Sequence, residues 1–252
     1  MRSRFLAWGH SSLAASLLLA FTPARAWACG VSGGSAVGVS SCSIEEHEEQ
    51  MRRRWRVGVG YGFASTAVKF DDFRFDETRH SGLATVDYAP TRRWTFELGV
   101  GSLLAGRLER DGISYDFQPG VLALLGASWR VLDADGARPF VLLQDQLAFA
   151  TTSTREGGSD SSPAIAYTAL DMRLGGLVGW TFRNVVSAYA LARVFGGPIF
   201  WQYQGDSLTG TDVHHYQLGG GLVVVIARRL DLSIEGVPLG EQGLSAAAGF
   251  AF

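Results

Sequence analysis

The stretch Trp55–Phe63 reads WRVGVGYGF, and its residues alternate between two kinds of side chain. Bulky apolar residues from Trp55 to Phe63 hold one parity, while Arg56 and three glycines hold the other. A period of two predicts a β-strand with two different faces. Similar alternation recurs through residues 54–252, down to the closing GLSAAAGFAF, where Phe252 still keeps the apolar parity. We count ten such strands, with eight as the alternative if the last short ones merge.

The segments between these strands alternate in character. Compact turns fall at 90–93, 133–139, 182–184 and 227–231, and looser connections fall at 68–80, 110–112, 155–163, 205–212 and 238–242. Up-and-down β-barrels have one tight rim and one loose rim of this kind. The sequence therefore predicts an all-β, antiparallel barrel with long loops at one end.

The two faces fit either a soluble periplasmic barrel that binds an apolar ligand inside, or a barrel that spans a membrane. The less apolar parity is rich in Gly, Ser, Ala and Gln, whereas a solvated surface is about 25–35% charged. Aromatic residues sit toward both ends of the apolar parity, as in the girdles of membrane barrels. We expect one girdle at Trp55, Trp94, Trp129 and Trp180 beside the tight turns, and another at Tyr61, Phe63, Tyr115 and Phe117 toward the loose ends. These features favour a transmembrane barrel in contact with lipid.

The N-terminus has the features of a signal peptide over residues 1–28. Arg2 and Arg4 precede the apolar run Leu13–Phe21, and small residues follow at the expected cleavage position. Removing residues 1–28 takes away three arginines and no acid, which changes the net charge from −2 to −5. An exported chain of this charge offers no basic footprint for nucleic acid.

Residues 29–53 are expected to form a periplasmic segment ahead of the barrel at 54–252. Cys29 and Cys42 are the two cysteines, and in an exported protein they favour a disulfide. The alternative is a lipoprotein acylated at Cys29. A short helix is expected to follow, because Ser43 and Glu46 have the spacing of a capping box.

The leader, the alternating strands and the terminal GFAF together resemble the small outer-membrane β-barrels of Gram-negative bacteria. The resemblance is at the level of the class, without a motif for any subfamily. It implies periplasmic termini, tight periplasmic turns, loose external loops and porin-like transport as one possible role. It also implies that Phe250 and Phe252 act as the signal for the barrel assembly machinery. Asp145 departs from the pattern, since it falls on the lipid parity between Leu143 and Leu147, and a bulge or slip is expected there.

The inward parity collects polar residues that must pair or be hydrated inside a narrow barrel. Two roles stay open: a closed, salt-bridged barrel with a structural or surface role, and a narrow channel for small polar solutes. The expected interior network is Arg56, Glu97, Arg107, Asp116, Arg130, Asp171, Arg173, Arg193, Asp231 and Glu235, together with Gln118, Gln144 and Gln146.

A less favoured reading is an outer-membrane enzyme with acids and histidines in its loops. His214 and His215 lie near Asp206 and Asp212, and the first loose connection carries further acids and a histidine (Asp71, Asp72, Asp76 and His80). No spacing among them matches a catalytic or metal-binding signature. We therefore expect no catalytic residue, metal or cofactor, and the oligomeric state stays open.

Overall fold

Nearly every residue that the structure describes lies in a β-strand. The computed structural model describes residues 54–133, 138–157, 163–183, 185–203, 205–227 and 229–252. The predicted signal peptide, the segment 29–53 and both cysteines lie outside these ranges. No helix in the described residues is long and apolar enough to cross a membrane. The strands are β1 (Trp55–Phe70), β2 (Phe73–Tyr88), β3 (Trp94–Arg110), β4 (Ile113–Phe117), β5 (Gly120–Leu132), β6 (Phe140–Glu156), β7 (Ile165–Phe182), β8 (Val186–Gly196), β9 (Ile199–Tyr203), β10 (Asp206–Asp212), β11 (Tyr216–Ile226), β12 (Leu230–Gly240) and β13 (Gln242–Ala251).

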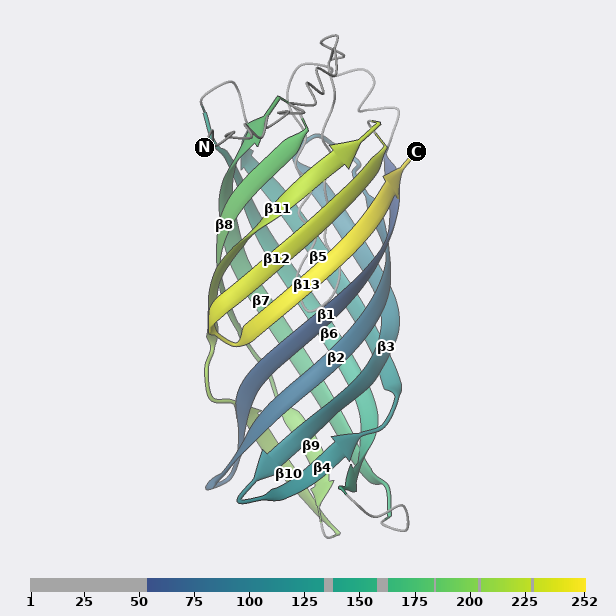
Figure 1. Ribbon diagram of the computed structural model, residues 1–252, viewed down its shortest axis with the longest axis vertical. Helices are drawn as coiled ribbons and strands as arrows, with labels where there is room; N and C mark the ends of the chain where they lie inside the picture. Colours follow the sequence, from purple (N-terminus) through teal and green to yellow (C-terminus); the bar gives the residue numbers. More distant parts are fainter. Residues whose placement is uncertain (1–53, 134–137, 158–162, 184, 204, 228) are drawn as a thin grey trace, which may run out of the picture.

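These strands form one closed, antiparallel barrel (Figure 1). Three wall strands are broken in two, because β4 continues as β5, β8 as β9 and β10 as β11 along shared neighbours. Pro119 and Pro198 lie at two of the breaks, where a residue without an N–H cannot donate to the ladder. Counted this way the wall has ten strands, closed by pairing of β1 with β13. The predicted fold class and the count of ten are confirmed.

The number of strands changes along the barrel axis. We call the end with the C-terminus and the turn at 89–93 the terminal end, and the opposite end the distal end (Figure 1). The β12–β13 hairpin turns back at Glu241, far short of the distal end. Beyond it, β1 exchanges its partner, since Ser65 pairs with Gln242 of β13 but Val68 pairs with Asp212 of β10. The distal end is thus a ring of eight: β1, β2, β3, β4, β6, β7, β9 and β10.

Two of the predicted loose connections are strands instead. Residues 68–80 continue β1 and β2 around a two-residue turn at Asp71 and Asp72, and residues 206–212 form β10. Lys69, Arg74 and Asp76 face outward, while Val68, Phe70 and Phe75 point inward and are buried, as are the more central Glu77 and Asp212. Around the β1–β2 turn the apolar side chains therefore face the interior and the polar ones the exterior, which is the reverse of the first half of β1. The sequence prediction of long loops was wrong because it did not allow for this reversal.

The exterior of the rest of the wall is apolar. Val59, Leu98 and Leu125 expose about three fifths of their surface, as expected for side chains that face lipid rather than a core. The four predicted tryptophans also face outward, with Trp94 and Trp129 stacked at 6.1 Å between ring centroids. A soluble barrel with an apolar ligand inside would place these side chains in water, so the exterior favours the membrane arrangement.

Two irregularities shift side chains away from the faces assigned from the sequence. A bulge opposite His80 and Ser81 leaves Leu104 unpaired, so that Arg107 turns to the exterior. The break at Pro119 does the same to β4: Asp116 lies outside, and Tyr115 and Phe117 are buried inside instead of joining a girdle. Sequence alternation alone misses both shifts because one extra residue inverts every face beyond it.

Asp145 lies on the exterior without the expected bulge. The β6–β7 register runs unbroken from Phe140 to Thr154, and Asp145 pairs with Ala127 on one side and Leu174 on the other. Its neighbours along the strand, Leu143 and Leu147, are exposed. The expectation of a slip is therefore wrong, and a carboxylate stands in the lipid-facing band.

Candidate functional site: the barrel interior

Near the terminal end, one buried arginine links side chains of three strands inside the barrel. Arg56 of β1 donates to Asp231 of β12 through Nε and Nη2 at 2.8 and 2.7 Å, and to Asp87 of β2 through Nη1 at 2.8 Å. All three side chains are buried. Gly249 makes room for the guanidinium, because a Cβ there would come within 1.8 Å of Arg56 Nη2. A buried arginine with two carboxylates joins three strands at the point where the first and last strands meet.

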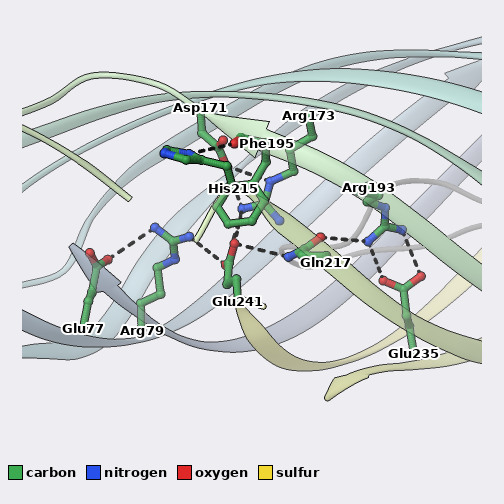
Figure 2. A network of polar contacts seen from close by, with 10 residues as sticks. All are labelled: Glu77, Arg79, Asp171, Arg173, Arg193, Phe195, His215, Gln217, Glu235 and Glu241. Atoms are coloured by element: carbon green, nitrogen blue, oxygen red, sulfur yellow. Dashed lines mark hydrogen bonds and ion pairs between the residues drawn. The ribbon is translucent and has the colours of Figure 1, made fainter. Parts of the chain in front are cut away.

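A second, larger network is centred on Glu241 (Figure 2). Glu241 sits at the tip of the short β12–β13 hairpin and is fully buried. Its carboxylate accepts from Arg79 Nη2 at 2.9 Å, Arg173 Nη2 at 3.1 Å and Gln217 Nε2 at 3.2 Å. The hairpin tip is thereby fastened to β2, β7 and β11 inside the barrel.

The two arginines of this network each hold a further carboxylate. Arg79 contacts Glu77 at 3.3 Å, and Tyr167 donates to the other oxygen of Glu77 at 3.0 Å. Arg173 donates from Nε to Asp171 at 2.7 Å. The sequence prediction included Asp171 and Arg173 but missed Glu77, Arg79 and Glu241, which all fell in segments read as loops.

Gln217 links this network to a third ion pair. Arg193 of β8 donates to Glu235 of β12 at 2.8 and 3.1 Å and contacts Gln217 Oε1 at 3.5 Å. Tyr189 also donates to Glu235, at 2.9 Å. The result is a continuous chain of polar contacts across the barrel, in which each charged side chain contacts one of opposite charge. Figure 2 shows this chain from Glu77 to Glu235.

Except for Gln118, which lies in the break between β4 and β5, the other predicted interior residues divide into two groups. Glu97, Arg130, Gln144 and Gln146 are buried inside, and Arg130 approaches Asp133 at 3.6 Å. Arg107 and Asp116 form an exposed ion pair at 3.0 Å on the exterior, which corrects their assignment to the interior.

The distal end of the interior is filled by apolar and aromatic side chains. Trp201 is completely buried, and its ring centre lies 5.4 Å from those of Phe70 and Phe75 and 5.1 Å from that of Tyr115. Its Nε1 donates to Thr154 at 2.9 Å. We call this group the distal aromatic cluster: Val68, Phe70, Phe75, Leu103, Leu108, Tyr115, Phe117, Tyr167, Ala169, Ile199 and Trp201.

A smaller apolar cluster lies inside the wall of β6, β7, β8, β11 and β12. It consists of Phe140, Leu142, Leu177, Tyr189, Leu191, Val223, Val225 and Val237. Apolar clusters and paired charges therefore share the lumen. A ring of about eight strands is just filled by its own side chains, and the distal ring of this barrel has that size.

The acids and histidines weighed for catalysis do not converge. Asp71 and Asp72 form the β1–β2 turn, His80 contacts Tyr61 on the exterior, and His215 Nδ1 lies 3.2 Å from the Phe195 carbonyl oxygen. Asp212 is buried, in contrast to the solvated loop position expected for it. Among the described residues, no group of three or more His, Cys, Asp or Glu is placed to hold a metal ion.

The chain's last residues are part of the wall. Ala251 pairs with Arg56, and the Phe252 amide donates to the Trp55 carbonyl at 3.0 Å. Phe250 and Phe252 expose their rings on the exterior. Their role as an assembly signal stays a prediction.

No protein-family model and no curated protein matches this sequence. Several solved structures are similar to it. The translocator domain of the autotransporter NalP from Neisseria meningitidis is 11% identical over 82% of this chain and 91% of that chain, with a TM-score of 0.46. An outer membrane channel from Pseudomonas putida F1 is 12% identical over 79% and 96%, with a TM-score of 0.44. The outer membrane protease OmpT from Escherichia coli is 9% identical over 79% and 97%, with a TM-score of 0.48.

The architecture and the exterior together indicate a barrel that spans a membrane. Among the described residues the wall is closed and antiparallel, its outer surface is apolar, and tryptophans face outward near the terminal end. The chain has the fold of a transmembrane β-barrel, with an outer surface suited to contact with lipid.

Proposed function

We propose that this protein is a closed barrel that presents its eight-stranded distal end at the cell surface and does not conduct solutes. The distal aromatic cluster is the observation that carries the proposal. The ring of Trp201 lies among aromatic rings from β1, β2 and β4. Thr154 of β6 accepts a hydrogen bond from Trp201, and Leu208 of β10 packs against the cluster. All eight strands of the distal ring lie around a packed apolar core.

The reversal of faces supports exposure of the distal end to water. Lys69, Arg74 and Asp76 are exposed outside the distal part of β1 and β2, while Val68 and Phe75 are buried inside. A polar exterior with an apolar interior is the pattern of a soluble domain. This pattern supports a distal part that projects beyond the lipid, and the resemblance of the sequence to outer-membrane barrels supports periplasmic termini with the distal end outside the cell.

Conductance in a planar bilayer tests closure. The refolded full chain is expected to give no unitary current steps, whereas a variant with Trp201→Ala and Phe70→Ala, which removes the two largest fully buried side chains of the cluster, is expected to give them. Reproducible steps from the unaltered chain that change on Arg173→Gln or Arg193→Gln would establish the narrow channel instead.

The single lysine of the chain provides a test of surface display. Lys69 is the only lysine in the sequence and is exposed on the distal exterior. An amine-reactive biotin reagent that does not cross membranes is expected to label the protein on intact cells, and Lys69→Arg is expected to abolish the label. Labelling that requires Lys69 and occurs only after the cells are broken would put the distal end on the other side.

A further inference from the structure

A cavity lies inside the barrel where the Glu241 network meets the distal aromatic cluster. Its volume is about 70 Å³, and Arg79, Arg173 and Tyr167 are among the residues that line it. A single buried water needs ~10–15 Å³ by this kind of measure. The cavity therefore has room for several waters or for one small organic molecule.

One wall of the cavity offers a hydrogen-bond donor and an acceptor that none of the described residues uses. Gln146 is 3% exposed, and its Nε2 has no partner in the described part of the chain. Asp171 accepts from Arg173 through Oδ2, while its Oδ1 has no partner among the same residues. Gln146 pairs with Arg173 and Ala148 pairs with Asp171 across β6 and β7, so the free donor and the free acceptor come from neighbouring positions on one inner face.

Most of the remaining wall is apolar, and the hydroxyl-bearing Ser81 and Thr152 lie beside it. The apolar residues come from β3, β5, β6 and β7, and they are small or aliphatic: Leu103, Leu122, Leu124, Ala148, Ala150 and Ala169. Pockets with an apolar lining and a few convergent polar groups are the usual form of a small-molecule site.

The charges around the cavity restrict the ligand. Arg79 is held by Glu77 and Glu241, and Arg173 by Asp171 and Glu241. An anion would find both guanidiniums already engaged with carboxylates. A cation would suit Asp171 Oδ1 but would face the Gln146 N–H donor. A hydroxyl group suits both, because it donates and accepts.

We propose that this cavity binds one small, uncharged, amphipathic molecule, with a hydroxyl head between Gln146 and Asp171 and a short aliphatic part against Leu122, Leu124 and Ala150. A short primary alcohol is the simplest molecule of this class. The site is independent of whether the barrel conducts.

The test follows the side-chain amide of Gln146 by NMR in the ¹⁵N-labelled full chain, refolded in detergent micelles. Gln146→Leu identifies the signal by removing it. 1-Butanol, present during refolding or added later, is expected to shift this signal saturably, while butyrate and butylammonium are not. Ala150→Leu fills the apolar part of the cavity and is expected to weaken the apparent affinity at least tenfold in the same micelles.

Three results would overturn the proposal. An equal response to butylammonium would mark a cation site, and an equal response in Ala150→Leu would show an effect of the detergent phase. A signal that stays unmoved at every alcohol concentration, while showing exchange with water, would mean that the cavity holds ordered water only.

Discussion

Replacing Glu241 by Gln is expected to lower the free energy of unfolding by about 3 kcal/mol. Glu241 is fully buried and accepts from Arg79, Arg173 and Gln217. Removing one partner of a buried ion pair costs ~3–5 kcal/mol because the other charge stays buried. Gln keeps one acceptor oxygen and the size of the side chain, so the loss falls at the lower end of that range.

The assay is urea unfolding of the refolded full chain in lipid vesicles, followed by tryptophan fluorescence and by heat-dependent mobility on a gel. Glu109→Gln is the matched control, since Glu109 is exposed on the distal exterior of β3. A surface change of this kind alters stability by no more than ~0.5 kcal/mol. The dependence of stability on urea concentration is expected to be the same for both, because the surface exposed on unfolding is unchanged.

A loss for Glu241→Gln within 1 kcal/mol of the control would refute the reasoning. It would mean that the hairpin tip is held by its backbone pairing alone. It would also mean that Arg79 and Arg173 are sufficiently satisfied by Glu77 and Asp171, and that the central network does not fix the end of the β12–β13 hairpin.

Three further predictions concern the wall. Gly249→Ala is expected to lower the free energy of unfolding by ~1–3 kcal/mol in the same urea assay, because the new methyl group displaces the guanidinium of Arg56. Gly236→Ala serves as the control, since a Cβ there meets none of the described atoms within 4 Å. Equal losses in the two variants would contradict the close approach of Arg56 to Gly249. Asp145→Leu is expected to raise the free energy of unfolding by ~1–2 kcal/mol, because a carboxylate that faces lipid destabilises a barrel, although less than the side chain of Arg or Lys does. A decrease would show that Asp145 has a stabilising partner. Deletion of Phe252 is expected to reduce the fraction of heat-modifiable barrel in isolated outer membranes, and an unchanged fraction would argue against an assembly signal.

The lipid-facing side of the wall follows from the sequence because its cause is local. Along the first half of β1 and along β5 and β7, each residue's parity is enough to tell lipid from lumen. Trp55, Val59 and Leu125 lie outside as predicted. The same rule assigned Asp145 to the exterior, and the error was to expect an irregularity where the strand has none.

The distal half was not predictable in this way. Leu104 is an apolar residue like its neighbours, and nothing in its local sequence marks it as the extra residue of a bulge. Pro119 does mark a break, but the resulting shift of face at Tyr115 depends on how β4 and β5 continue along β3. Register is a property of two strands together, and a single strand's pattern does not contain it.

The central network was missed for a related reason. Glu77 and Arg79 lie in a charged segment, and Glu241 lies in a turn, so composition indicated solvent at all three positions. Their burial results from the short last hairpin, which brings its tip inside the wall. Only the three-dimensional pairing of β1 with both β13 and β10 shows that this tip lies halfway along the barrel.

The exchange of partners on β1 has a consequence for the order of assembly. A simple barrel is sealed once, when its first and last strands meet. This wall has two seams on the same strand, one with β10 and one with β13. The pairing of β1 with β10 involves no residue after Val213. The eight-stranded distal ring is therefore able to close before the β12–β13 hairpin pairs with β1, and that pairing then completes the terminal half of the wall.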